Sequence, residues 1–236
     1  GGDSYSLTSS DVELDSETQF TVTLSSTDKL NVNGLLNTNG TSADDSTSYN
    51  LAAAENWNVG AASGATIADL TSNTITVSGV AVPTITDATY NATTGVLVVT
   101  GTGMAKLDGV TNDIDVSLLS LSGQGGDSYS LTSTDVELDS ETQFTVTLSA
   151  TDKLNVNGLL NTNGTSADDS TSYNLDRTSV GYGKSVDLGA LRNMKKKTIT
   201  DSGVAVPTIT HATSNATTGL LVVTGTAMAT LDGRTN

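Results

Sequence analysis

The sequence contains no cysteine, two prolines, one histidine and few aromatic residues, which make up 4% of its 236 residues. The absence of cysteine excludes a disulfide framework, a thiolate metal site and a cysteine nucleophile. Basic residues are also scarce: ten lysines and arginines stand against 26 aspartates and glutamates, for a formal net charge of −16. Because phosphate contacts need Lys and Arg, we expect no nucleic-acid binding. No apolar run is long enough for a transmembrane helix, so we also expect no membrane insertion.

The chain does contain a repeat with a period of 124 residues. Residues 1–50 match residues 125–174 except at two positions, and the register then holds to the end without insertion or deletion. A fixed period of this length predicts an array of similar modules rather than an enzyme with one cleft. By this period the chain holds a first repeat, 1–124, and a truncated second repeat, 125–236. Since the chain stops inside a motif that continues in the first repeat, we expect it to be a piece of a longer polypeptide.

The two prolines indicate a different physical boundary. Pro83 and Pro207 lie one period apart, each within Val-Ala-Val-Pro-Thr-Ile-Thr, and proline is common at strand starts and junctions. These boundaries give a partial module 1–82, a complete module 83–206 and a partial module 207–236. The first piece lacks the strands that the last piece carries, so residues 207–236 of a neighbouring copy could complete it by strand addition. A continuous chain cut at arbitrary points explains the same pattern, and both interpretations stay open.

Short apolar alternations separated by polar turns predict an all-β fold. Residues 84–90 and 96–100 flank the turn 91–95, and residues 136–148 alternate as a hairpin with one apolar face. Further strands are expected around 114–118, 129–131, 173–175 and 198–206. About seven short strands and one helix per unit predict tandem immunoglobulin-like β-sandwich repeats, each with one short helix.

The expected helix follows the second hairpin. Ser149 or Thr151 can cap its N-terminus, and Asp152 falls in its first turn. An apolar stripe is expected from Leu154, Leu159 and Leu160, and the polar run 161–164 ends the helix.

The repeat fails in one place. Residues 52–73 and 176–197 share no aligned residue, and the second version holds six of the ten basic residues. Loops on a fixed scaffold are where binding differences usually lie, so one interpretation is a variable loop that gives each module its own surface. Neutral drift in a solvated connection and an error in the sequence explain the difference equally well.

Calcium is the leading cofactor hypothesis. Asp108, Asp113 and Asp115 lie just before an expected strand, where a loop can gather the six to eight oxygen ligands that Ca²⁺ takes. A solvated acidic loop is the alternative. A second acidic pattern alternates along an expected strand and its turn, at Asp11, Glu13, Asp15 and Glu17 and again at Asp135, Glu137, Asp139 and Glu141. We interpret it as the solvated face of a hairpin rather than a cation site.

No motif indicates an enzyme. Paired carboxylates can hydrolyse glycosides, but the chain supplies no aromatic sugar platform, and both acids are copied in every module. Residues 181–185 lack the first glycine of a phosphate-binding loop. His211 is the only histidine and forms no triad by itself.

Three stretches resemble the tandem repeats of very long bacterial surface or secreted proteins of the giant adhesin type. They are residues 83–90 leading into 94–101, residues 144–153, and the Tyr-Asn-Leu-Ala-Ala-Ala-Glu-Asn-Trp segment at 49–57. The Ala-Ala-Ala-Glu-Asn-Trp part of the last segment, residues 52–57, has no counterpart in the second copy. The resemblance covers nearly the whole chain except 176–197. It implies an extracellular stalk or fibre, often stiffened by calcium, at the bacterial cell surface. The expected partners are neighbouring copies head to tail or adjacent modules of the same chain. The alternative is an adhesive module that binds a glycan or protein through the loop 176–197.

Overall fold

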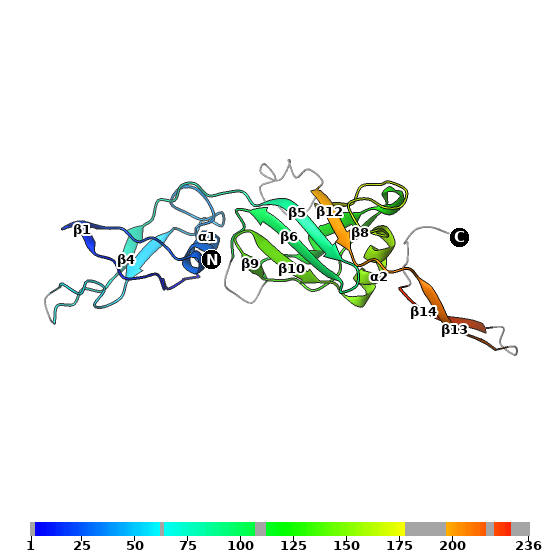
Figure 1. Cartoon of the computed structure of the whole chain (residues 1–236). Helices are drawn as coiled ribbons and strands as arrows, with labels where there is room; N and C mark the ends of the chain where they lie inside the picture. The colour runs from blue at the N-terminus through cyan, green and yellow to red at the C-terminus, as the bar shows by residue number, and fades with distance from the viewer. Residues whose placement is uncertain (1–2, 62–63, 107–111, 178–196, 216–219, 228–236) are drawn as a thin grey trace. The chain divides into compact units, whose positions relative to one another are not determined.

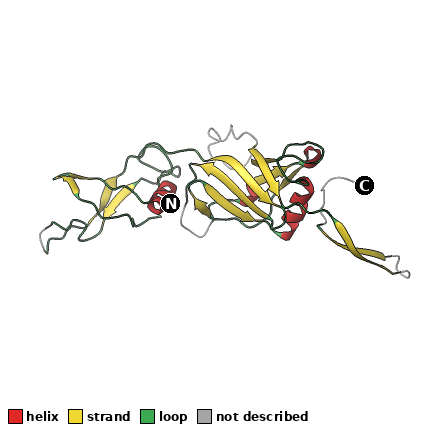
Figure 2. Ribbon diagram, in the orientation of Figure 1, coloured by secondary structure: helices red, strands yellow, loops and turns green. Residues whose placement is uncertain are grey.

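The computed structural model describes residues 3–61, 64–106, 112–177, 197–215 and 220–227. The described chain is mostly β, with one large curled sheet, which confirms the all-β prediction. It divides into two compact units (Figures 1 and 2). Unit 1 runs to Ala81 and includes the short segment that starts at Ala105, and unit 2 holds Val82–Met104 and the described residues from Asn112 onward.

Unit 2 is built on an eight-stranded sheet with the order β8-β7-β11-β12-β5-β6-β10-β9. All neighbouring strands are antiparallel except β12 and β5, which are parallel. The strands are β5 (Thr84–Asn91), β6 (Val96–Thr102), β7 (Leu119–Ser122), β8 (Ser128–Ser130), β9 (Leu138–Ser140), β10 (Gln143–Thr147), β11 (Asn174–Arg177) and β12 (Lys197–Ser202). Alternate residues of these strands point into one apolar core, as the period of two requires. Its fully buried members include Leu97, Val99, Leu121, Val146, Leu160, Tyr173 and Ile199.

Helix α2 (Ala150–Leu159) begins where the sequence predicts. The hydroxyl of Ser149 accepts a hydrogen bond from the backbone N–H of Asp152, so Ser149 is the N-cap. The helix packs against β7 and β8. The predicted apolar stripe is correct for Leu159 and Leu160 but wrong for Leu154, which is 38% exposed. Val156, one turn after Asp152, is buried instead.

The strand expected around 114–118 is replaced by a short 3-10 helix, η1 (Val116–Leu118). The carboxylate of Asp115 accepts hydrogen bonds from the N–H and the hydroxyl of Ser117, at 3.0 and 2.6 Å. This local bond closes a turn at the point where alternation alone suggests extended chain. The strand ladder starts directly after η1, at Leu119. A second short 3-10 helix, η2 (Gln124–Gly126), follows β7.

Unit 1 repeats part of this pattern with fewer described strands. It contains β1 (Leu14–Ser16), β2 (Gln19–Phe20), α1 (Ser26–Leu35), β3 (Asn50–Ala53) and β4 (Asp69–Thr74). These form two separate two-stranded sheets, β1-β2 and β3-β4. Helix α1 is capped by Ser25 in the same way as α2 is capped by Ser149.

The last described strands, β13 (Thr208–Asn215) and β14 (Leu220–Thr226), pair only with each other in the described part of the chain. This hairpin is the sequence copy, one period later, of β5–β6. The two hairpins also share a register shift at the same place, between Ile85 and Asp87 in one and between Ile209 and His211 in the other.

Candidate functional site

The β5–β6 hairpin fills the middle of the unit 2 sheet. β6 pairs with β10 on one side, with Val99 opposite Phe144. β5 pairs in parallel with β12 on the other side, with Ala88 aligned with Ile199. Leu97 and Val99 are fully buried. The hairpin therefore joins the two halves of the sheet and supplies a central part of the core.

Helix α2 forms hydrogen bonds with the turn of this hairpin. The ammonium of Lys153 donates a 2.6 Å hydrogen bond to the carbonyl of Thr93. The hydroxyl of Tyr90 donates to the side-chain oxygen of Asn157 at 2.8 Å, and the amide of Asn157 donates to the carbonyl of Ala92 at 3.3 Å. The hairpin is thus held along both strands and at its tip.

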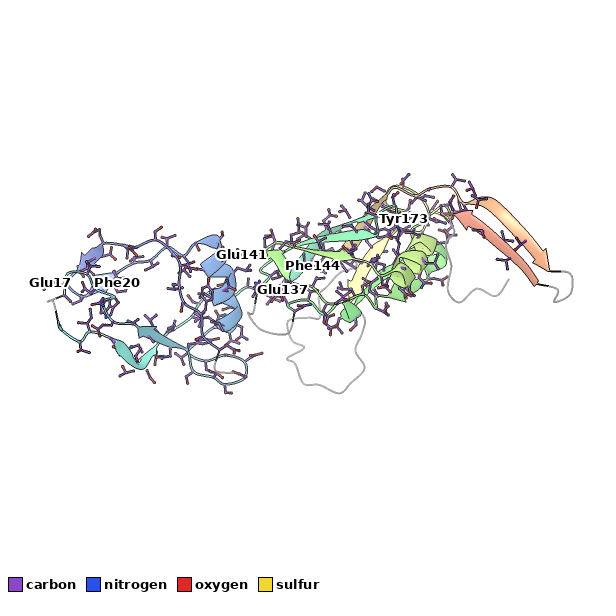
Figure 3. All side chains as sticks on the ribbon, turned by 90° about the horizontal axis from the view of Figure 1, so that it is seen from below. Glu17, Phe20, Glu137, Glu141, Phe144 and Tyr173 are labelled. Carbon is purple, nitrogen blue, oxygen red and sulfur yellow. The ribbon has the colours of Figure 1, made fainter. Side chains whose placement is uncertain are left out.

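Unit 1 has no such hairpin, and the consequence is visible at identical residues. Four apolar side chains that are buried in unit 2 are exposed at the equivalent positions of unit 1 (Figure 3 labels the two phenylalanines). The exposed fractions are 48% for Leu7 against 1% for Leu131, 54% for Leu14 against 7% for Leu138, 42% for Phe20 against 2% for Phe144, and 51% for Leu51 against 2% for Leu175. Because the residues are the same, their own chemistry does not cause the difference. Burial of each such side chain stabilises a protein by about 1.5–3 kcal/mol.

The backbone of unit 1 is also unpaired where the hairpin would lie. β10 has five residues, whereas its equivalent β2 has two. β12 ends at Ser202, whereas β4 ends at Thr74, four residues short of the position equivalent to Ser202. Among residues 75–78 the ladder is reduced to one isolated bridge, between Val77 and Gly40. β4 has six residues, as β12 has, so it is displaced toward the N-terminus rather than shortened. β2 and β4 are the equivalents of β10 and β12, the strands that flank β5–β6 in unit 2.

The β13–β14 hairpin, called the spare hairpin below, pairs with no other described strand and exposes apolar side chains. Ile209 is 71% exposed, Val222 is 49% exposed and Val223 is 41% exposed. The equivalent of Val223 in unit 2 is Val99, which has no exposed surface. In the described part of the chain, unit 1 therefore has no counterpart of the β5–β6 hairpin, and the β13–β14 hairpin pairs with no other strand.

A buried carboxylate organises the helix start in each unit. Asp152 has no exposed surface, and its two oxygens accept five hydrogen bonds from another part of the chain. The donors are the hydroxyl of Tyr129, the N–H and hydroxyl of Thr132, and the N–H and hydroxyl of Ser133. Asp28 makes the same contacts in unit 1 with Tyr5, Thr8 and Ser9.

These hydrogen bonds decide the charge of both aspartates. Burial by itself would raise the pKa of Asp152, but the hydrogen bonds from Ser133 and Thr132 outweigh it and lower the pKa below its usual value. The hydroxyl of Ser9 lowers the pKa of Asp28 in the same way. Sequence reasoning placed Asp152 in the first turn but missed this role. The signal was the copying of Tyr-Ser-Leu-Thr-Ser together with an aspartate 19 residues after its last serine.

Asp201 is a third buried acid, and it stands where the other copy has Val77. It lies on β12, is 2% exposed, and is aligned with Tyr90 across the parallel pair. Its Oδ1 accepts from the N–H of Ser202 at 2.6 Å, and its Oδ2 has no hydrogen-bond partner. Burial raises the pKa of Asp201 to about 7. Burial and the Asp201 carboxylate together raise the pKa of the Tyr90 phenol.

The calcium candidates are only partly described. Asp108 lies outside the described residues. Asp113 accepts from the N–H of Leu138 at 3.0 Å, and Asp115 caps η1. Among the described residues, no group of three or more His, Cys, Asp or Glu side chains is placed to hold a metal ion. The three-residue site therefore stays a prediction.

The acidic residues that alternate along the sequence lie largely on the solvent-exposed face of their hairpin. Asp135, Glu137 and Asp139 are exposed, whereas Leu138 between them is buried. Asp139 accepts a 2.7 Å hydrogen bond from the hydroxyl of Thr145. In unit 1 the equivalent acids, Asp11, Glu13, Asp15 and Glu17, are all exposed.

The variable segment is described mainly in unit 1. The carboxylate of Glu55 accepts from the N–H groups of Ile67 and Ala68, and the indole N–H of Trp57 donates to the carbonyl of Ile67 at 2.8 Å. Trp57 also contacts Phe20, with ring centroids 6.0 Å apart. The counterpart residues 178–196 lie outside the described residues, so the adhesive alternative that depends on them stays a prediction.

No family model, curated protein or solved structure matches this chain. No helix among the described residues is long and apolar enough to cross a membrane.

Proposed function

We propose that this chain is a load-bearing repeat segment of a long extracellular protein that forms a stalk or fibre. In this proposal each complete module is an immunoglobulin-like sandwich, and modules join head to tail through their hairpins. The resemblance to repeats of giant bacterial surface proteins supports the location at the cell surface. No step of the proposal needs a catalytic centre.

The observation that carries the proposal is the parallel pair of β5 and β12. β5 is the first strand of unit 2 and β12 is its last strand before the spare hairpin. Four consecutive residue pairs align them, from Ile199 with Ala88 to Ser202 with Asn91. Because the strands are parallel, the chain enters at one end of the pair and leaves at the other. A pull on the two ends therefore loads all the ladder hydrogen bonds together, in shear.

A force measurement tests this geometry. Because the chain has no cysteine, single cysteines can be introduced as attachment points. Cysteines replacing the exposed Val82 and Val206 pull β5 against β12 in shear, whereas cysteines replacing Val82 and Thr102 open the β5–β6 hairpin from its end, where Thr84 faces Thr102. We expect the shear attachment to need a several-fold higher rupture force in single-molecule pulling. Equal forces in the two geometries would contradict a load-bearing role.

Calcium stiffening is a separate part of the proposal. If Asp108, Asp113 and Asp115 bind Ca²⁺, the metal stabilises the folded state by mass action. We expect the melting temperature in millimolar calcium to exceed that in chelator by several degrees, and Asp113→Asn with Asp115→Asn to remove the difference. A melting temperature that is the same in calcium and in chelator would remove the metal from the proposal and leave the mechanical role untouched.

A further inference from the structure

We infer that the carboxyl group of Asp201 makes the strand pair β5–β12 sensitive to protons, so that the pair resists shear while this carboxyl is neutral and separates more easily once it is ionised. The inference rests on the proposed load-bearing function and adds a control to it. Its basis is the position of a buried acid inside the strand pair that carries the load.

Asp201 lies within the parallel ladder and not at its margin. It is aligned with Tyr90 in the third of the four consecutive pairs that join β12 to β5, which lie side by side (Figure 1). On its other side, its carbonyl accepts a 2.9 Å hydrogen bond from the N–H of Gly164, and its N–H donates to the carbonyl of Gly164 at 2.7 Å. The residue is thus enclosed between β5 and Gly164, and it is 2% exposed.

The surroundings of this carboxyl suit its neutral form. Oδ1 accepts a 2.6 Å hydrogen bond from the N–H of Ser202, and Oδ2 has no partner among the described residues. Asp152, which is also buried, accepts five hydrogen bonds instead. Burial raises the pKa of Asp201 to about 7, and the N–H groups of Ser202 and Ala92 offset this only in part.

The nearest elements place no cation against Asp201. From β5 it is faced by Tyr90, whose hydroxyl donates to the side-chain oxygen of Asn157. Burial and the Asp201 carboxylate raise the pKa of this phenol, so Tyr90 stays neutral across the range in which Asp201 titrates. Residues 161–166, which contain the Gly164 contact, include no titratable side chain.

The charged groups of α2 and β11 have other positions. On α2, the ammonium of Lys153 donates to the carbonyl of Thr93, and the carboxylate of Asp152 is held by its own donors. β11 pairs with the first two residues of β12, and its charged residues follow that pair in the direction away from Asp201. An ionised Asp201 therefore has no counter-charge among the described residues.

A charge at this position acts against the ladder that carries the load. The ionised carboxylate gains water only when β12 separates from its neighbours, so ionisation favours the separated strands. The folded pKa lies above the unfolded value of about 3.9. The resistance that the neutral carboxyl allows is therefore full below about pH 4 and is lost as the pH rises to 7.

The first repeat carries Val77 at the equivalent position. Valine does not titrate, so the proton sensitivity belongs to modules that carry the acid and not to every repeat. At neutral pH, a module with the acid would separate at a lower force than an otherwise equal module with valine. The acid thus sets which module of an array opens first.

Constant-force pulling of the full chain tests this inference. Attachment through Val82→Cys and Val206→Cys loads β5 against β12, and the rate of rupture at pH 8 is expected to exceed that at pH 5 by up to about 100-fold, the limit reached if Asp201 is solvated when the strands separate. Asp201→Val and Asp201→Asn are neutral at both pH values and should remove most of this ratio. Asp139→Asn, at an exposed acid of the same sheet, is the matched control and should retain it.

The outcomes separate this inference from the function on which it rests. A rupture rate that is the same at pH 5 and pH 8, or a ratio that persists in Asp201→Val, would overturn the inference. The load-bearing function survives either result if the shear attachment still resists more force than attachment through Val82→Cys and Thr102→Cys. Equal forces in these two geometries contradict the function, whatever the effect of pH.

Discussion

Replacement of Asp152 by alanine is expected to destabilise unit 2 by about 3–5 kcal/mol, the range for breaking a buried charged network. The reason is the number of donors that converge on one carboxylate. Alanine leaves the N–H groups of Thr132 and Ser133 without this acceptor, in addition to three hydroxyl donors. Each unsatisfied buried donor costs about 1–3 kcal/mol. The helix start would also lose its link to β8 and the segment that follows it.

Asparagine at the same position separates shape from charge. Its carbonyl can replace Oδ2, which accepts from the two N–H groups, while its NH₂ can replace Oδ1, which accepts only from hydroxyls that can rotate. We therefore expect Asp152→Asn to lower the free energy of unfolding by about 1–2 kcal/mol, because hydrogen bonds to a charged carboxylate are replaced by weaker bonds to a neutral amide. Asp139→Ala, at an exposed acid of the neighbouring hairpin, is the control and should stay within about 0.5 kcal/mol.

The readout must distinguish the two units. The single tryptophan, Trp57, lies in unit 1, so its fluorescence reports that unit, and hydrogen exchange of unit 2 peptides reports the other. The pKa of Asp152 is lowered in the fold, so its contribution is present above the unfolded pKa of about 3.9 and is lost as the pH falls through the lowered folded value. The difference between the original chain and Asp152→Ala should therefore shrink in acid. A cost for Asp152→Ala no larger than that for Asp139→Ala would show that the network does not hold the helix.

The sequence predicts local elements well where neighbours in the chain determine them. The strands around the turn 91–95 and the helix after Ser149 follow from alternation and capping. Leu154 shows where such prediction fails: periodicity identifies an apolar face of a helix but does not show which of its residues the rest of the fold covers. η1 shows a second failure, because the side chain of Asp115 bonds locally and overrides an extended pattern.

The features that matter most for function depend on contacts distant in the sequence. Nothing in the local pattern indicates that β5 pairs in parallel with a strand more than 100 residues away. The five donors to Asp152 lie 19 to 23 residues before it. Comparison of the two copies is the one sequence signal that reaches these features, because it shows which residues are repeated together.

The two copies also show how the same sequence behaves in two different structural environments. Phe20 and Phe144 have the same neighbours in the sequence, yet one is 42% exposed and the other 2% exposed. The same residues form a five-residue strand in one unit and a two-residue strand in the other. Strand length here is set by whether a partner strand is present, which agrees with the context dependence of β propensity.

Asp201→Val is expected to stabilise unit 2 at neutral pH, unlike most substitutions of a buried residue. The carboxylate is 2% exposed, and one of its oxygens has no partner, so its burial carries the cost of an unsatisfied polar group, about 1–3 kcal/mol. The other copy already carries valine at this position, Val77, so the backbone accommodates that side chain. Tyr90, aligned with Asp201 on β5, keeps its hydrogen bond to Asn157. We expect unit 2 of Asp201→Val to unfold at a higher denaturant concentration at pH 8.

The stabilisation expected from Asp201→Val depends on pH, because the folded pKa of Asp201 is raised. The folded pKa of Asp201, about 7, lies above the unfolded value of about 3.9, so between these values the folded state holds a proton that the unfolded state has released. Stability from this group is therefore full below about pH 4 and is lost as the pH rises to 7. The gain from Asp201→Val should be largest at pH 8 and shrink toward pH 4, and Asp201→Asn should flatten the same slope with a smaller gain. Asp152 acts in the opposite direction below its unfolded pKa, so the two acids together place the stability maximum of unit 2 on the acid side of neutrality. A gain for Asp201→Val that stays constant from pH 4 to pH 8 would show that packing, and not the buried charge, is what the substitution changes.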